Sequence, residues 1–194
     1  MKNVFTPPGA ALVGALSLTA LSLGVSAPAH AANFTGSYAV VNWTTSTPVG
    51  GSVNTGGAPN SISLTSPDNS SIGGANFTIA AAGSGTVSFN WSYTTTDADP
   101  SRDPFCYLLD GVFTRLTDDN GSVAQSGTAN FNVTQGQIFS FGAFSIDGLS
   151  GASTTTITNF DAPVPEPLTL LGASAAVGFG AAFKRRSGKA TEQK

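Results

Sequence analysis

The sequence is almost without cysteine and histidine. Cys106 is the only cysteine among 194 residues, and His30 is the only histidine. A lone cysteine excludes an internal disulfide and a thiolate zinc site, and we expect Cys106 to be a small buried hydrophobic residue. His30 falls in the signal peptide predicted below. The mature protein would then lack the usual general base, the His-activated nucleophiles and histidine-ligated metals.

Charge is also scarce. Charged residues make up 10% of the chain, against about 25% in a typical soluble domain. The formal net charge is −3, and five of the eight basic residues lie at or beyond Lys184, so the central part is more acidic than the whole. A nucleic-acid interface needs a basic patch or stripe, so we expect no nucleic-acid partner.

The N-terminus has the three parts of a secretory signal peptide. Lys2 supplies the positive charge, residues 10–25 form an uncharged apolar run, and Ala29-His30-Ala31 has the small-x-small pattern of a cleavage site. We therefore predict a signal helix in residues 1–31, with cleavage by signal peptidase after Ala31. The alternative is a buried helix or a retained anchor, but the run is short for a membrane span.

The C-terminus predicts a second targeting segment. Its rigid motif, Pro165-Glu166-Pro167, is followed by an uncharged apolar run over residues 168–183 and by the basic cluster Lys184, Arg185 and Arg186. The run is slightly shorter than the roughly 20 residues of a spanning helix, and snorkelling basic side chains extend its reach. The basic cluster should stay on the cytoplasmic side, which places the preceding domain across the membrane.

This order of Pro-Glu-Pro, apolar run and basic cluster resembles the PEP-CTERM sorting tail. The resemblance covers residues 164–189. It implies a transmembrane precursor in the inner membrane that an exosortase cleaves near Pro165-Glu166-Pro167. It also implies delivery to the cell envelope or extracellular matrix of a bacterium that makes exopolysaccharide. A plain single-pass anchor with a stop-transfer cluster is the alternative.

Residues 32–163 lack helical periodicity and predict one all-β domain. Alternating apolar and polar residues are clearest over residues 87–93, and Gly, Asn, Asp and Pro punctuate the runs. Further strands are expected at residues 34–44, 62–64, 77–81, 105–109, 112–116, 129–133, 138–141 and 154–160. Asn120-Gly121 carries the signature of a tight hairpin turn. The pattern predicts an antiparallel β-sandwich of jelly-roll type.

Residues 127–141 look like the late strands of extracellular carbohydrate-binding jelly rolls. They also resemble the β domains that often precede PEP-CTERM tails. The first likeness implies a carbohydrate-binding module, and both imply a domain that works outside the cell. Fold analogy does not by itself carry function.

Two groups of side chains could carry chemistry in this domain. Asp97, Asp99 and Asp103 lie in one loop, and oxygen-rich loops outside the cell can bind Ca²⁺. The loop lacks the glycine and terminal glutamate of an EF-hand, so the alternative is a turn closed by Asx hydrogen bonds, with Arg102 pairing one acid. Trp43 and Tyr107 are candidates to stack on sugar rings, with Trp43 directed outward. Trp91 shares a strand face with Val87 and is expected in the core.

No catalytic motif is present: the sequence has no nucleophile elbow, phosphate-binding glycine loop or His-Glu metal helix. A glycosidase could work with two aspartates alone, but sequence cannot place a pair at a working distance. The main hypothesis is therefore a non-enzymatic, structural or adhesive envelope or matrix protein associated with exopolysaccharide. A carbohydrate-binding module, with Ca²⁺ as its candidate ion, is the alternative, and a hydrolase is the remote one.

Overall fold

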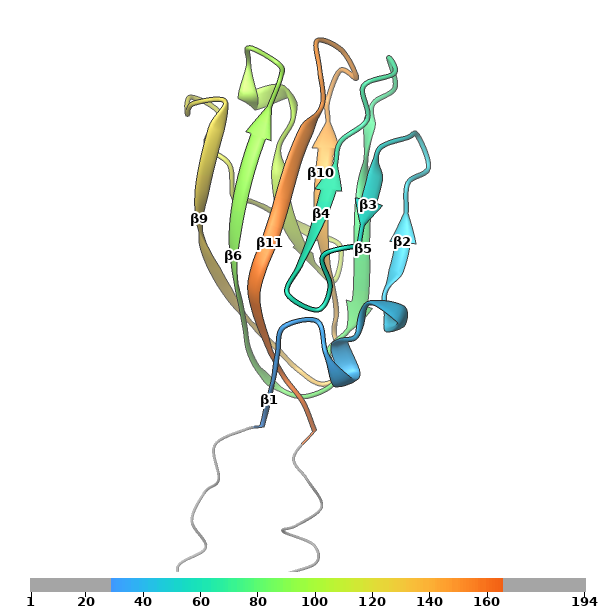
Figure 1. The fold of residues 1–194 in the computed structure, drawn as a ribbon, viewed down its shortest axis with the longest axis vertical. Helices are drawn as coiled ribbons and strands as arrows, with labels where there is room; N and C mark the ends of the chain where they lie inside the picture. Colours follow the sequence, from blue (N-terminus) through green and yellow to red (C-terminus); the bar gives the residue numbers. More distant parts are fainter. Residues whose placement is uncertain (1–28, 166–194) are drawn as a thin grey trace, which may run out of the picture.

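The computed structural model describes residues 29–165, which form two antiparallel β-sheets packed face to face (Figure 1). The six-stranded sheet has the order β3-β4-β11-β6-β9, with β1 added beside β11, and the five-stranded sheet has the order β2-β5-β10-β7-β8. The prediction of an all-β antiparallel sandwich is confirmed. The helices predicted in the signal peptide and the tail lie outside the described residues, apart from the last residues of the signal peptide. Within residues 29–165, no helix is long and apolar enough to cross a bilayer.

The elements follow one another closely along the chain. The strands are β1 (His30–Ala32), β2 (Thr44–Ser46), β3 (Ser52–Asn54), β4 (Ser61–Thr65), β5 (Gly73–Ala80), β6 (Gly85–Thr95), β7 (Phe105–Leu109), β8 (Val112–Arg115), β9 (Ala124–Val133), β10 (Ile138–Ser145) and β11 (Ser153–Pro163). Three short 3-10 helices lie at Gly36–Tyr38, Val40–Asn42 and Pro100–Arg102. Most strands predicted after residue 60 appear at or near the expected positions.

The segment before β2 differs from the prediction. Residues 34–44 were expected to form one strand, but they fold into the first two 3-10 helices, and Gly36 has a φ of +55°. The apolar residues Phe34 and Tyr38 are nevertheless buried. Tyr38 ends the first 3-10 helix, and Phe34 lies just before that helix begins. Apolar spacing alone did not distinguish these turns from a strand.

The turn at Asn120-Gly121 also differs from the prediction. It joins β8 of the five-stranded sheet to β9 of the six-stranded sheet, so it is not a hairpin turn. The side chain of Gln125 holds this crossover by accepting from the Asp118 amide at 2.8 Å and donating to the Asp118 carbonyl at 2.9 Å. The hairpin in this region lies at Asp110-Gly111 between β7 and β8, where both residues have positive φ, as a type I′ turn requires.

An aromatic layer fills the space between the two sheets. Phe77 and Phe141 from the five-stranded sheet both stack on Trp43, with ring centroids 4.6 and 5.6 Å away. Phe160 of β11 meets the Trp43 ring edge-on at 5.8 Å. Such aromatic pairs add about 0.5–1.5 kcal/mol each beyond the area that they bury.

The ends of the described chain lie together at one pole of the sandwich, at the bottom of Figure 1. β1 pairs with the last residues of β11, and the Val164 amide donates to the Ala29 carbonyl at 2.8 Å. His30 Nδ1 lies 2.7 Å from a carboxylate oxygen of Asp161. The predicted cleavage after Ala31 would separate His30 and Ala31 from the rest of β1. That cleavage stays a prediction.

Tyr38 links three separate segments at this pole. Its buried hydroxyl donates to the Pro163 carbonyl at 2.7 Å and accepts from the Ala82 amide at 2.9 Å. Burial raises the pKa of Tyr38, so this hydroxyl stays protonated and able to donate. The end of β11 is thereby tied to the β5–β6 connection and to the first 3-10 helix.

We expect Tyr38→Phe to lower the free energy of unfolding by about 1–3 kcal/mol, because it leaves the half-buried Ala82 amide and the buried Pro163 carbonyl without their partner. The measurement is chemical denaturation of both proteins. Tyr107→Phe is the matched control, since the Tyr107 hydroxyl makes no hydrogen bond to another described residue and its side chain is half-buried. Equal losses in the two variants would contradict the bridging role of Tyr38.

Candidate ligand-binding face

The outer face of the six-stranded sheet carries hydroxyl and amide side chains in rows across the strands. Because strand residues alternate between the two faces, the apolar residues of β4 and β11 point inward and their Ser and Thr neighbours point outward. Register places one row on Asn54, Ser63, Thr156, Ser92 and Ser126. The second row contains Ser52, Thr65, Thr154, Thr94 and Ala124. The third row contains Ser61, Thr158, Asn90 and Thr128. We call these three rows the hydroxyl face.

Two side-chain contacts link neighbouring strands within these rows. The hydroxyl oxygens of Thr65 and Thr154 lie 3.1 Å apart on β4 and β11. On β9, Thr128 donates through its hydroxyl to the side-chain oxygen of Asn90 at 2.9 Å. Cross-strand pairs of this kind stabilise a sheet by roughly 0.2–1 kcal/mol each. None of the three rows contains a charged or aromatic residue.

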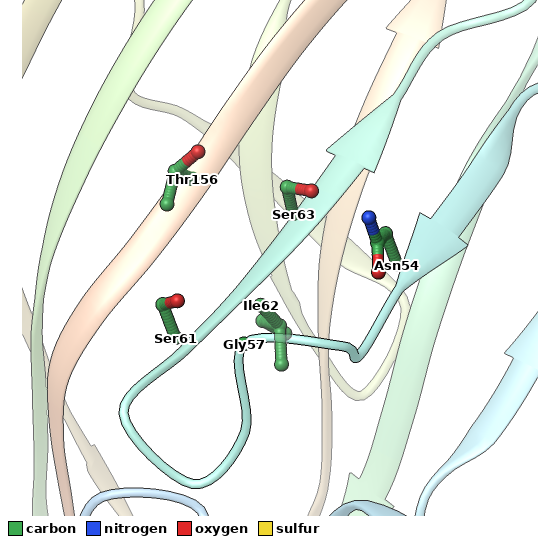
Figure 2. Close-up of a pocket in the computed structure, with 6 residues that line it drawn as sticks. All are labelled: Asn54, Gly57, Ser61, Ile62, Ser63 and Thr156. Atoms are coloured by element: carbon green, nitrogen blue, oxygen red, sulfur yellow. The ribbon is translucent and has the colours of Figure 1, made fainter.

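A shallow hollow of about 200 Å³ lies on this face where β3, β4 and β11 meet (Figure 2). Its polar lining comes from Asn54, Ser61, Ser63 and Thr156, each on one of those strands. Ile62 contributes from beneath, since its own side chain is buried in the core. On the side of the β3–β4 loop, the hollow is bounded by Gly57. A Cβ added at this position would collide with the Ser61 hydroxyl. The loop can lie this close to β4 because position 57 has no side chain.

The polar groups of the hollow are available to a ligand. Among the described residues, the hydroxyls of Ser61, Ser63 and Thr156 make no hydrogen bond to another protein group. The side-chain oxygen of Asn54 accepts from the Gly56 amide at 2.8 Å, which leaves the Asn54 NH₂ group as a donor. Each hydroxyl can donate one hydrogen bond and accept two. This set suits an uncharged ligand that has many hydroxyl groups of its own.

The candidate sugar-stacking residues are placed elsewhere. Trp43 was expected to point outward, but its side chain is 8% exposed and its Nε1 donates to the Tyr38 carbonyl at 2.9 Å. The outward placement of Trp43 was therefore wrong, because its ring is the centre of the aromatic layer. Tyr107 lies on the inner side of the five-stranded sheet, and Phe131 stacks on its ring at 4.4 Å. The structure does not bring Trp43 and Tyr107 together, and Trp91 is in the core as expected.

The three candidate calcium ligands do not converge. Asp103 is fully buried and accepts from the hydroxyls of Thr95 at 2.9 Å and Ser66 at 3.4 Å. Asp99 is exposed and accepts from the Ser101 amide at 3.1 Å and from Arg102 Nε at 3.3 Å. Asp97 accepts from the Asp99 amide at 2.8 Å. In residues 29–165, no group of three acidic, histidine or cysteine side chains could hold a metal ion. The alternative of an Asx-closed turn describes this loop.

The environments of these acids shift their pKa values in opposite directions. Burial raises the pKa of Asp103, and the negative charges of Asp97 and Asp147 add to that rise, while hydrogen bonds from Ser145 and Thr95 oppose it. The hydrogen bonds from Ser101, followed by the interaction with Arg102, lower the pKa of Asp99. The loop therefore holds one carboxyl whose pKa is shifted upward and one whose pKa is shifted downward.

Cys106 is buried, as predicted, on β7. Its Sγ lies 3.5 Å from the Gly142 carbonyl oxygen of the neighbouring strand. Burial raises the pKa of the Cys106 thiol, and the nearby Arg115 only partly opposes this. Because the thiolate is the reactive form of cysteine, we assign Cys106 a packing role.

Comparison with known proteins gives structural similarities only. No family model matches the chain, and no curated protein matches it. A family 35 carbohydrate-binding module from Clostridium thermocellum is 11% identical, with a TM-score of 0.36, over 66% of this chain and 97% of the module. A family 11 carbohydrate-binding module of a cellulosomal cellulase from the same organism is 13% identical, with a TM-score of 0.38, over 72% and 97%.

A third similar structure is the K1 cleaved adhesin domain of Lys-gingipain from Porphyromonas gingivalis. It is 13% identical with a TM-score of 0.40, over 64% of this chain and 92% of that domain. Identities and TM-scores this low carry no inference about what this chain binds.

The stability of the protein should depend on the protonation of Asp103. Because its folded-state pKa is raised, the folded protein holds the proton more tightly than the unfolded chain does. The stabilisation is complete below the ordinary pKa of 3.8 and is lost as the pH rises through the folded value. Asp103→Asn imitates the neutral acid, so we expect it to remove this fall in the free energy of unfolding.

The measurement is chemical denaturation at a series of pH values from below 3.8 upward. Asp99→Asn is the matched control in the same loop. It should keep the fall, because the pKa of Asp99 is shifted the other way. If Asp103→Asn and the parent protein show the same pH profile, the assignment is wrong.

Proposed function

We propose that this protein is an exported, non-enzymatic domain that binds neutral polysaccharide through the hydroxyl face of its six-stranded sheet. One observation carries the proposal: Ser61, Ser63 and Thr156 present unengaged hydroxyls, with the Asn54 amide, in one hollow on that face. This favours the carbohydrate-binding alternative over a purely structural role. The two roles are compatible, since a matrix protein must hold the polymer around it.

The chemistry of the hollow explains the choice of ligand. A neutral sugar polymer offers hydroxyl donors and acceptors along its length, and the lining offers both kinds of group in return. The rows continue from the hollow across β11, β6 and β9, so an extended chain can make repeated contacts. The lining contains no carboxylate, histidine or cysteine, so it offers no side chain that could act as a general base to activate its hydroxyls or a water molecule.

The affinity of a single contact should be low. A net hydrogen bond contributes only about 0.5–1.5 kcal/mol, and none of the three rows supplies an aromatic ring for stacking. Useful binding then depends on several contacts along one polymer, or on several copies of the protein. We therefore propose binding to a long exopolysaccharide and not to a short soluble sugar.

We also propose the route that delivers the domain to its ligand. Signal peptidase removes the leader, the apolar run of residues 168–183 holds the precursor in the inner membrane, and an exosortase cuts near Pro165-Glu166-Pro167. The domain then reaches the cell envelope or the extracellular matrix. This route rests on the resemblance of residues 164–189 to the PEP-CTERM tail, of which only Val164 and Pro165 lie in the described part.

The binding proposal predicts the behaviour of a variant without the three hydroxyls. We expect Ser61→Ala/Ser63→Ala/Thr156→Val to bind the producing organism's neutral exopolysaccharide about 10 to 100 times more weakly, as expected for the loss of two or three hydrogen bonds. The measurement is affinity electrophoresis of the full-length protein in gels containing that polysaccharide. A parallel screen on an array of neutral glycans identifies the sugar.

Thr44→Val/Ser46→Ala is the matched control, because it removes exposed hydroxyls from β2 in the other sheet. It should migrate like the parent protein. If the parent protein and the triple variant are retarded equally, the hollow is not the binding site. Absence of binding to every polysaccharide tested would overturn the proposed function.

The sorting proposal makes a separate prediction. In the producing bacterium, Glu166→Ala should leave uncleaved precursor in the inner membrane, because it removes the central residue of the motif. Immunoblots of membrane and extracellular fractions give the measurement. Glu192→Ala removes an acidic residue outside the motif and should be processed normally. Normal processing of Glu166→Ala would contradict sorting through this motif.

A further inference from the structure

The six-stranded sheet ends in a long strand that nothing in the described structure covers. β9 has 10 residues and is an edge strand of the sheet, at the left in Figure 1. We call the outer edge of such a strand a margin of the sheet. It contains no charged residue and no proline. Apart from its bonds to β6, no backbone group of residues 125–133 is hydrogen-bonded to another described residue. Alternate N–H and C=O groups along this margin therefore face solvent.

The other sheet margins show the usual protections against strand pairing. β2 and β3 have three residues each, and β8 has four, with Arg115 paired to Asp119. Short strands and charged side chains are standard means of preventing edge-to-edge association. β9 has neither, and it is the longest strand at a margin of the two described sheets, so it is the most extended template there for another strand.

The geometry of β9 is also regular enough to pair again. Its register with β6 runs without a shift from Gly85 opposite Val133 to Thr94 opposite Ala124. A bulge, such as the register shift between Thr158 and Asp161 on the interior strand β11, would twist the margin away from a partner, and the β6–β9 register has none. On the inner side of β9, Phe131 stacks on Tyr107 of β7 in the other sheet, which holds this part of β9 in place.

We propose that β9 pairs antiparallel with β9 of a second copy of this chain. A two-fold axis between the two strands makes the contact self-complementary: where one residue of the first copy faces a second residue of the other copy, the same pair recurs in reverse on the other side of the axis. Acidic side chains outnumber basic ones in residues 29–165, so two copies carry net charge of the same sign. Because β9 contains no charged residue, two copies can pair along it without placing equal charges opposite one another.

The pairing would join the two six-stranded sheets into one continuous sheet. Ser126, Thr128 and Asn130 point outward on β9, so the hydroxyl faces of the two copies would meet along the shared margin. This inference does not depend on the proposed polysaccharide binding, and its test contains no sugar. The two proposals can therefore fail separately.

The test is sedimentation velocity of the full-length chain in detergent over a series of concentrations. We expect the parent protein to form a dimer as the concentration rises. Ser126→Lys/Asn130→Lys should remain monomeric, because the lysines of two paired margins would lie close to one another. Added lysines reduce the net negative charge, so a loss of association cannot be attributed to overall repulsion.

The matched control is Ser92→Lys/Thr94→Lys, which places the same charge on exposed positions of β6, one strand inside the margin. It should dimerise like the parent protein. A parent protein that stays monomeric, or a Ser126→Lys/Asn130→Lys variant that associates like the parent, would overturn the proposal. Equal loss of dimer in both lysine variants would also overturn it, because the effect would not be specific to the margin.

A second measurement needs no variant. Hydrogen exchange of the parent protein at low and high concentration should show slower exchange in residues 125–133 at high concentration, because the outward amides gain partners. Exchange in β8, the other margin on this side of the sandwich, should stay unchanged. Unchanged exchange in β9 would contradict strand pairing even if the protein associates by another route.

Discussion

The packing of aromatic rings around Trp43 is the interaction on which the two-sheet structure depends. Trp43 stacks on two rings from the five-stranded sheet and meets Phe160 of β11 from the six-stranded sheet. Without disulfides, the sheets are held together by apolar burial. The segment that contains the two 3-10 turns before β2 matters for the same reason, because its residues Phe34, Tyr38 and Trp43 all lie in this layer.

Because the aromatic rings are buried between the sheets, the outer face of the six-stranded sheet is polar and carries little charge. The strands of the six-stranded sheet alternate, so large apolar residues inside require something else outside, and here that is Ser, Thr and Asn. The outcome is a sheet face rich in hydrogen-bonding groups and poor in charge. Such a face can hold a neutral, hydroxyl-rich polymer, while the low charge also leaves the β9 margin without electrostatic protection.

The two poles of the sandwich differ in what they can do. One pole carries both ends of the described chain, with β1 paired to β11 and Val164 bonded to Ala29, so a tail that begins at Pro165 starts directly at the folded domain. The acidic loop around Asp99 belongs to the connection at the far end of β6. The hydroxyl face lies along the side of the sandwich, between these two poles.

The sequence alone determined the fold class and most strand positions, because alternation of buried and exposed residues is local: residues 87–93 and 105–109 reveal their strands without any partner. It also placed Cys106 and Trp91 in the core. Serine and threonine on β4 and β11 were visible as alternating polar positions. However, the hollow between Ser63 and Thr156 could not be predicted from them.

Only the tertiary structure decided which strands are neighbours, because pairing joins segments that lie far apart in the chain. Ser63 and Thr156 meet through the β4–β11 register, and β9 is a margin only because no strand follows it in the sheet. The same holds for Trp43, whose direction depends on 3-10 turns stabilised by distant rings, and for Asp103, whose carboxyl turns inward to Thr95 and Ser66 instead of joining Asp99. The local sequence pattern indicates which face of a strand is buried. Long-range packing determines which strands and side chains lie next to that strand.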